Sequence, residues 1–591
     1  MDMAIPNRFS GKAFFFGFLA GAKKVIENQH ELNKINVFPV PDADTGTNLA
    51  MTMRYIMENA RPHASYQRTI DAIANAALEG AVGNSGIIFA QYLYGVNTES
   101  RDDSLHGLIQ AFKNAVRHMM EAVANPIEGT MITVIREWAE FLENHRGRLG
   151  TWFELWNRSL ERAQQSCLET TKKLDVLAKA NVVDAGAKGM VLFLEGVVDF
   201  LKKPSFKKAY IVLPSFFGFE DDVEADLPET VSYRYCTEAV LKGTDLDRQR
   251  IRTAVQDLGD SLAIAGSPKT MRIHVHTSQP ATLFHRLKDF GTLSAQKADD
   301  MQIQLDTAHR RKWNIALLTD SSCDLPQDLM DYYQIHVVPL HLFFGENQYL
   351  DKLTITPDQF YQVLEKSPVY PSTAQPAVQT FQTAYSRLAS HYDSIIAIHL
   401  NQKFSGTFSN SLKAAERITS ETGKPITVVD SKHLSGTLGL LVLRTARAVA
   451  QGLTHSTIIQ NVMHWVSQTK IYVGVKTLKF MVRSGRVSPM KGQLANLLGL
   501  KPIVTIENGQ SVLLDKTFSQ KASLKKILKR MAGLKIWEYC ILHAHNGESA
   551  SEYSIELEKQ IGKKPAFVMD ITPVIGLHAG TGAVAVGFMN E

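Results

Sequence analysis

Two aspartates separated by one residue, Asp42 and Asp44, lie in a segment suited to binding a metal ion. Pro39 and Pro41 precede them, and because proline fixes φ and disfavours helix, this segment is predicted to be extended. Residues two apart in an extended chain point the same way, so both carboxylates are expected to face one point. Carboxylate oxygens are ligands that Mg²⁺ prefers. The pair therefore indicates a candidate magnesium site.

A helix start is predicted directly after the two aspartates. Gly46 allows a tight turn. Side chains suited to capping stand at Thr45, Thr47 and Asn48, and the helix is predicted to begin at Leu49. A helix N-terminus beside two carboxylates favours a nucleotide phosphate with its Mg²⁺. An acidic turn before a helix has the same local pattern, so the aspartates alone leave both interpretations open.

Three clusters of small residues interrupt residues 10 to 200, where apolar residues recur at helical spacing. Their sequences are GAVGNSG at 80–86, NPIEGTM at 125–131 and NVVDAGAKG at 181–189. Glycine and serine at a helix start can bring backbone N–H groups to a phosphate. Close contact between helices also requires small residues, so the clusters taken singly favour neither interpretation.

Taken together and in order, the aspartate loop and the GNSG, EGTM and VVDAG segments resemble the nucleotide pocket of the DhaL-type domain. This domain is the ATP-binding part of dihydroxyacetone kinases and of bacterial fatty acid kinases. The resemblance implies an all-α helical barrel that uses ATP and Mg²⁺, with Asp42 and Asp44 as catalytic metal ligands. The residues implied in nucleotide binding are Thr45, Thr47, Asn48, Asn84, Ser85, Gly86, Gly129, Thr130, Met131, Asp184 and Gly186.

Two positions depart from the kinase pattern. Ala43 stands where the kinases usually have glycine, and Val82 stands where they often have arginine. The alanine leaves both metal ligands in place, whereas the valine removes one expected contact on the phosphate side.

A second candidate metal site follows from Tyr233 onward, where the pattern changes to strands and helices. His274 and His276 are predicted to share one face of a strand at 271–276, and Cys236 lies in a strand predicted near 235–241. Cysteine and histidine are typical Zn²⁺ ligands, but two solvent-facing histidines and a core cysteine would show the same spacing. The segment resembles the middle domain of fatty acid kinases, which carries the motifs YCTE and HVHT. The resemblance implies a structural Zn²⁺ at Cys236, His274 and His276, with Glu238 as a weaker candidate ligand.

The last part of the chain alternates predicted strands and helices, which favours an α/β domain. Its polar segments are TDSSCDLP at 319–326, STAQP at 372–376, FSGT at 404–407, VDS at 429–431, a GR turn at 485–486 and HAGTG at 578–582. In this order they resemble the DegV family of fatty-acid-binding proteins. The resemblance implies that a long-chain fatty acid is bound by Thr373, Ser405, Gly406, Arg486 and His578. Ala374 and Ser484 differ from the residues common in that family.

The length of 591 residues predicts several domains, for which we expect the ranges 1–203, 204–311 and 312–591. The net charge of +5 without a basic block argues against a nucleic-acid partner. Four widely spaced cysteines fit a reducing, cytoplasmic location. The apolar stretch at 13–22 is expected to be a buried first helix rather than a signal-peptide core, and it is too short to span a bilayer.

These expectations combine into a fatty acid kinase that transfers the ATP γ-phosphate to the carboxylate of the acid held by the fused DegV-like domain. Two alternatives stay open. One is a dihydroxyacetone-type kinase, which would need a partner to capture the ketone. The other is a non-catalytic, lipid-binding regulatory protein, which Ala43 and Val82 favour. Further expectations are a homodimer, a downstream acyltransferase as partner, and at most peripheral contact with a membrane.

Overall fold

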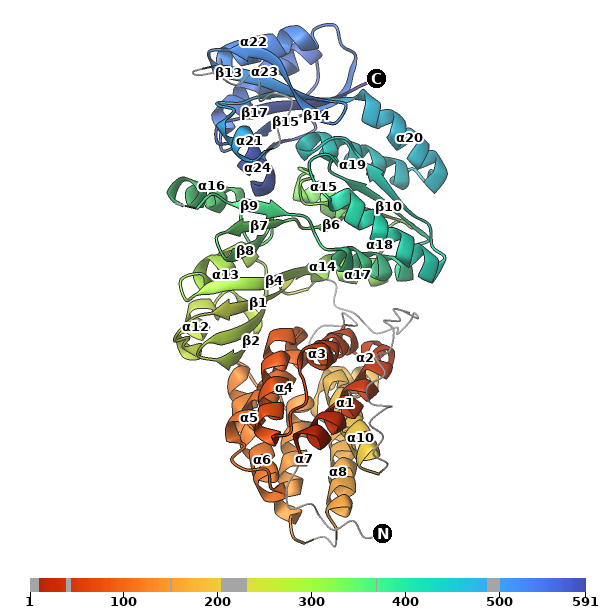
Figure 1. Cartoon of the computed structure of the whole chain (residues 1–591). Coiled ribbons are helices and arrows are strands. Elements are labelled where there is room, and N and C mark those ends of the chain that lie inside the picture. Colours follow the sequence, from red (N-terminus) through yellow and green to blue (C-terminus); the bar gives the residue numbers. More distant parts are fainter. Residues whose placement is uncertain (1–9, 39–43, 149–150, 203–230, 368, 486–499) are drawn as a thin grey trace. The chain divides into compact units, whose positions relative to one another are not determined.

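The computed structural model describes the chain except for residues 1–9, 39–43, 149–150, 203–230, 368 and 486–499 (Figure 1). Asp42, Ala43, Arg486 and most of the segment expected to link the first two domains therefore lie outside the described residues. Two compact units are present, one formed by residues 1–279 with 286–302 and the other by 280–285 with 303–591.

The first part of the first unit is helical throughout its described residues. Its helices are α1 (Gly11–Glu27), α2 (Gln29–Lys34), α3 (Thr45–Asn59), α4 (Tyr66–Gly80), α5 (Gly83–Glu99), α6 (Leu105–Ala122), α7 (Met131–His145), α8 (Trp152–Lys173), α9 (Asp175–Ala180) and α10 (Ala185–Lys202). The predicted buried first helix is confirmed as α1, and the GNSG segment lies at a helix start as predicted. The VVDAG segment also leads into a helix, α10.

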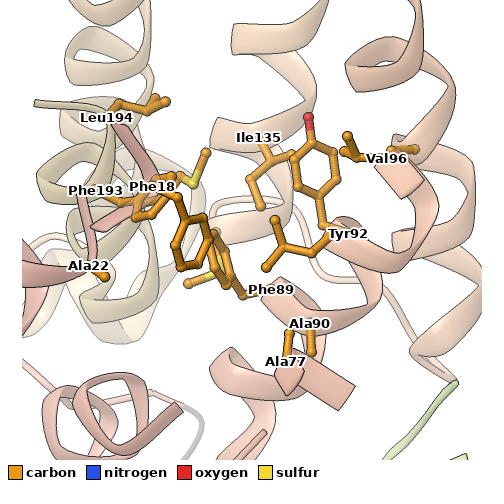
Figure 2. Close-up of a cluster of buried hydrophobic side chains, with 14 of the residues drawn as sticks. Phe18, Ala22, Ala77, Phe89, Ala90, Tyr92, Val96, Ile135, Phe193 and Leu194 are labelled. Carbon is orange, nitrogen blue, oxygen red and sulfur yellow. The ribbon is translucent and has the colours of Figure 1, made fainter. Parts of the chain in front are cut away.

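Aromatic side chains from three helices meet in the core of this helical part (Figure 2). The rings of Phe18 in α1, Phe89 in α5 and Phe193 in α10 contact one another, with centroids 5.1–6.5 Å apart. Tilted and edge-on aromatic pairs of this kind add to the stabilisation from apolar burial. These ring contacts therefore hold α5 and α10, whose N-termini carry two of the small-residue clusters, against α1.

The middle part of the chain is an antiparallel sheet with strand order β2-β3-β1-β4. Its elements are β1 (Tyr235–Lys242), α12 (Arg248–Val255), β2 (Gly259–Ser267), β3 (Thr270–Thr277), α13 (Pro280–Leu287), β4 (Thr292–Asp300) and α14 (Met301–His309). Both predicted strands, β1 and β3, are confirmed. Ala263 and Ala265 of β2 are buried in the same hydrophobic core as the helices, so the sheet and the helical part pack as one body.

The second unit is an α/β domain, as predicted. Its elements are β5 (Ile315–Asp320), α15 (Gln327–Tyr332), β6 (His336–Val338), β7 (His341–Phe344), β8 (Asn347–Leu350), α16 (Pro357–Lys366), β9 (Ser372–Ala374), α17 (Val378–His391), β10 (Ser394–His399), α18 (Thr407–Thr422), β11 (Ile426–Asp430), α19 (Ser435–Ala450), α20 (His455–Gln468), β12 (Thr469–Gly474), α21 (Lys479–Arg483), β13 (Lys501–Glu507), β14 (Gln510–Thr517), α22 (Gln520–Met531), β15 (Ile536–His543), α23 (Gly547–Ile561), β16 (Val568–Asp570), α24 (Pro573–Ala579) and β17 (Val584–Asn590).

Three sheets organise this unit: a parallel sheet β11-β10-β5-β6, a mixed sheet β14-β13-β12-β17-β15-β16 and a small sheet β8-β7-β9. The TDSS, FSGT and VDS segments follow or end the parallel strands β5, β10 and β11, so they gather at one edge of that sheet. The polar STAQP segment at 372–376 has the composition of a loop, but its residues 372–374 form β9. They do so because β7 offers an antiparallel partner, pairing Leu342 with Thr373.

Candidate functional site

Asp44 occupies the N-cap of α3, so this helix begins at Thr45, earlier than Leu49, where the sequence pattern placed it. Thr47 therefore lies within the first turn instead of capping it. Asn33 of α2 holds Thr47 in place: its side-chain oxygen accepts from the Thr47 N–H at 2.9 Å, and its amide donates to the Thr47 hydroxyl at 2.9 Å. The Thr45 hydroxyl donates to the side chain of Asn36. Contacts with α2 thus fix the helix start beside the predicted metal loop.

The GNSG segment at the start of α5 lies directly against α3. The Val82 N–H donates to the Thr52 hydroxyl at 3.1 Å. Gly83 has a φ of +67°, and a Cβ there would lie only 2.5 Å from the side-chain amide of Asn48. The structure therefore brings the predicted nucleotide residues of α3 and α5 together.

The starts of α7 and α10 join the same cluster. A Cβ on Gly186 would lie 3.0 Å from the Ser85 hydroxyl and 3.4 Å from the Met131 Cβ, so three helix starts approach one another at this glycine. Gly129, which precedes α7, has a φ of +88°, a conformation that favours glycine. The described residues of the four motifs thus meet at one end of the helical part.

Asp184 connects two of these helix starts. Its carboxylate accepts hydrogen bonds from the N–H of Met131 at 3.1 Å and of Ala187 at 2.7 Å. Burial raises the pKa of Asp184 to about 6, although those N–H bonds act in the opposite direction. Because Oδ1 of Asp184 accepts hydrogen bonds from the backbone of both helices, Asp184 holds the starts of α7 and α10 together at the predicted nucleotide site.

Cys236, His274 and His276 form a buried cluster whose candidate ligand atoms all lie within 4.8 Å of one another. Nδ1 of His274 lies 3.9 Å from the Cys236 sulfur, and its Nε2 has no hydrogen-bond partner among the described residues. Burial and the neighbouring His274 lower the pKa of His276 to about 3, so its ring is neutral near pH 7, as a metal ligand must be. One cysteine and two histidines fit Zn²⁺, which binds cysteine thiolate and imidazole nitrogen.

Lys297 of β4 is a functional candidate that the sequence reasoning missed. Its ammonium lies 2.7 Å from Asp299, and the side chain is 31% exposed. Burial alone would lower the pKa of Lys297, but the negative groups around it, Asp299 foremost and Asp44 among them, raise it well above its usual value. The sheet of the middle part therefore contributes a cation that interacts electrostatically with Asp44. The alternation Lys297-x-Asp299 on a strand was the available signal.

The second unit contains a cavity of about 140 Å³ whose lining is mostly apolar. Thr373 from β9, Ser405 before α18 and His578 from α24 all line it, so three of the predicted head-group residues share one cavity. Gly406 is not among the lining residues, and it precedes the first residue of α18. Apolar lining residues include Ile471, Val504, Leu542, Ile571 and Ala585. An apolar cavity with a few convergent polar groups suits a long-chain acid.

Buried aspartates hold the segments around this cavity. Asp324 accepts from the Ser435 hydroxyl at 2.6 Å and from the Thr572 N–H at 3.0 Å, and it pairs with Lys352 at 3.2 Å. Burial raises the pKa of Asp351, whose carboxylate accepts from Ser321, to about 6. The TDSSCDLP motif therefore supports the cavity wall, in addition to Ser322 lining the cavity directly.

Three family models match consecutive parts of the chain. Residues 39–199 match the DAK2 domain, 232–308 match the FakA-like middle domain of fatty acid kinases, and 314–591 match the DegV family. None of the described helices is long and apolar enough to cross a membrane.

Curated relatives and solved structures match the chain in part. An uncharacterised protein of Staphylococcus aureus strain USA300 is 30% identical over 322 residues, covering 52% of this chain and 59% of that relative. A fatty-acid-binding DegV family protein from Thermus thermophilus is 26% identical and covers 47% of this chain and all of its own, with a TM-score of 0.44. DegV of Bacillus subtilis, described as a fatty acid binding protein, is 27% identical with the same coverage and a TM-score of 0.43. The chain is a fusion of a DhaL-type DAK2 domain, a fatty-acid-kinase-like middle domain and a DegV family domain.

Proposed function

We propose that the protein is a fatty acid kinase that carries its own acyl-binding domain. The observation that carries this proposal is the presence, in one chain, of a converging set of DAK2 helix starts and an apolar DegV-domain cavity lined by Thr373, Ser405 and His578. The middle part, which matches the middle domain of fatty acid kinases, supports a carboxylate acceptor over a ketone.

In this proposal Asp42 and Asp44 hold Mg²⁺, which neutralises charge on the ATP phosphates when bound. The first turns of α5, α7 and α10 provide backbone N–H groups for the phosphates. The zinc site of Cys236, His274 and His276 stabilises the middle sheet beside them. In this proposal the aspartates bind the metal ion and the cysteine and histidines stabilise the sheet. None of these side chains is required to act as a general base.

The acceptor is a carboxylate held by Thr373, Ser405 and His578, and it is already ionised near pH 7. One carboxylate oxygen forms a bond to the γ-phosphorus, the bond from that phosphorus to the β–γ bridging oxygen breaks, and ADP leaves with the electron pair. The product is an acyl phosphate. Because no proton is removed, the rate depends on alignment and on neutralisation of charge.

Hydroxylamine trapping tests this proposal directly. The purified protein, loaded with a long-chain fatty acid and given ATP and Mg²⁺, is expected to form an acyl hydroxamate, and native mass spectrometry is expected to show a bound acid. Asp44→Ala is expected to abolish hydroxamate and keep the acid, whereas Ser405→Ala with His578→Ala is expected to weaken acid binding. A wild-type protein that binds the acid but forms no hydroxamate would contradict kinase activity.

That negative outcome would support the second candidate, a lipid-binding regulator. Val82 favours it, because a hydrophobic residue stands at the N-cap of α5 where the kinases often place a cation. A dihydroxyacetone kinase is distinguished by ATP turnover that depends on the ketone and its carrier, and is independent of the acid.

The remaining expectations stay proposals. They are the domain ranges 1–203, 204–311 and 312–591, a homodimer, a downstream acyltransferase that consumes the acyl phosphate, and a cytoplasmic location.

A further inference from the structure

A buried carboxylate of the middle part binds the start of the predicted phosphate-binding helix. Oε1 of Glu238, in β1, accepts a hydrogen bond from the Gly83 N–H at 2.6 Å, joining residues 155 positions apart. The Glu238 side chain is 0% exposed, and Gly83 is buried too. Hydrogen bonds donated to a charged acceptor in such surroundings are short and strong.

The second oxygen of this carboxylate is also occupied. Oε2 accepts from the Arg272 guanidinium at 2.6 Å, and the same guanidinium donates to the Glu79 carbonyl at 3.3 Å. Glu79 lies in the last turn of α4, just before the GNSG segment. The Glu238–Arg272 pair therefore holds the chain on both sides of the turn that leads from α4 into α5.

Charge balance explains how a carboxylate can lie beside an anion site. A lone carboxylate at a helix N-terminus would compete with a phosphate for the same positive end of the helix dipole. Here Arg272 pairs with Glu238, and Lys297 stands opposite Glu238 in the register of β1 and β4. Because these cations offset its charge, Glu238 can fix the backbone without repelling a nucleotide.

Metal ligation by Glu238 is the competing role. The cluster of Cys236, His274 and His276 is adjacent, and Nδ1 of His274 lies 3.4 Å from Oε1 of Glu238. Both oxygens of the carboxylate already have closer partners, in Gly83 and Arg272. This arrangement favours a bond to the helix start over a bond to a metal.

We propose that Glu238 is a positioning residue for the nucleotide phosphates, which it serves by holding Gly83 and thereby the first turn of α5. The middle part is then a component of the nucleotide site in addition to being a spacer before the DegV domain. This inference rests on the proposed function, because it assumes that α5 receives the phosphates.

Two double variants test the role of the Glu238–Gly83 hydrogen bond. Glu238→Gln/Arg272→Met and Glu238→Met/Arg272→Met both remove the buried ion pair and have similar volumes. They differ in that glutamine keeps an oxygen for the Gly83 N–H and methionine does not. Removing both charges together avoids leaving one of them unpaired in the interior. Affinity for Mg–ADP is measured by calorimetry on the full chain, with zinc content and thermal unfolding of the same samples.

The glutamine variant is expected to bind Mg–ADP at least about tenfold more tightly than the methionine variant, since a buried N–H without an acceptor is costly. Zinc content is expected to be equal in the two. Equal affinities in two folded, zinc-containing variants would overturn the inference while leaving the proposed function standing. Selective loss of zinc from the methionine variant would assign Glu238 to the metal instead, and would overturn it too. A wild-type chain that binds no Mg–ADP would overturn the proposed function and this inference with it.

Discussion

The ammonium of Lys297 lies among negative groups of the middle sheet and interacts electrostatically with Asp44 of the nucleotide loop. Val82 leaves the helix start without the cation that the kinases it resembles often have. We propose that Lys297 of the middle sheet supplies a positive charge to the phosphates in its place. A positive charge held in place beside a transferring phosphoryl group stabilises the transition state, because the charged side chain does not have to rearrange during the reaction.

Lys297→Met is therefore expected to lower kcat/KM for ATP by about tenfold or more in the hydroxamate assay, because it removes a cation near the phosphates. Lys269→Met, at an exposed lysine in the turn between β2 and β3, is the matched control and is expected to change little. Equal activity of the two variants would exclude a role for Lys297 at the phosphates.

His336 in β6 gives a residue-level prediction for stability. Burial, together with Arg387 and His391, lowers the pKa of this ring to about 3. The unfolded chain takes up a proton near pH 6.5 whereas the folded protein does not, so stability is full above about pH 6.5 and is lost as the pH falls toward 3. The loss is up to about 1.4 kcal/mol per pH unit across this window.

Replacing this ring tests that pH dependence. His336→Phe keeps an aromatic ring against Tyr392, whose centroid lies 6.0 Å away, and it is expected to show a smaller drop in urea midpoint between pH 7 and pH 5 than wild type. His464→Phe, at an exposed histidine, should retain the wild-type drop. An unchanged drop in the His336 variant would show that other groups dominate the acid response.

At the scale of elements, the turn between α4 and α5 depends on Gly83. Gly83→Ala is expected to reduce Mg–ADP affinity by about tenfold or more, because alanine disfavours the positive φ and its Cβ would meet the Asn48 amide. Gly147→Ala is the matched control, since Gly147 has a φ of +70° but nothing within 4 Å of an added Cβ. A similar loss of Mg–ADP affinity in both variants would show that backbone strain at any positive-φ glycine causes the effect, and that the contact between Gly83 and α3 does not.

The strands β1 and β3 carry the zinc prediction. Cys236→Ser is expected to lower zinc from about one per chain and to lower the melting temperature of the first unit, because a buried Cys/His site contributes folding energy when occupied. Elemental analysis with calorimetry provides the measurement. Wild-type protein that contains no zinc and unfolds at the same temperature as the variant would contradict the site.

Elements with strong local patterns were predictable from the sequence. The alternation at 271–276 predicted that His274 and His276 share a face, and the small residues of the GNSG segment predicted the start of α5. The start of α3 was misplaced because its position depends on Asn33 of a different helix. The bond from Glu238 to Gly83 was beyond local reasoning, since 155 residues separate its partners and only the folded packing brings them together.

At the scale of the whole molecule, the fusion places a DAK2 domain and a DegV family domain, which we propose to bind ATP and the fatty acid respectively, on one chain. Linking the two raises the effective concentration of the acid at the nucleotide site, provided that the domains can meet. In a dimer, the acid bound by one chain could instead receive its phosphoryl group at the nucleotide site of the partner chain.

Mixing two inactive variants distinguishes these routes. Asp44→Ala is co-assembled with Ser405→Ala/His578→Ala, and hydroxamate formation is measured. Transfer between chains is expected to restore up to about a quarter to a half of the activity, because only mixed pairs contain one intact site of each kind. Activity that stays absent in verified mixed dimers would show that each chain phosphorylates only its own acid.

Ala263 and Ala265 of β2 are buried in the core of the helical part, so they also determine where the chain can be truncated without exposing that core. A fragment ending near residue 203 would lose Ala263, Ala265 and the acceptor for the Gly83 N–H, exposing an apolar face that the full chain covers. Such a fragment is expected to aggregate, whereas a fragment that extends through β4 keeps the contact between the helices and the sheet buried. Recombination that exchanged the helical part alone would replace only one side of this buried contact. The helices and the sheet are therefore expected to be exchanged together during evolution.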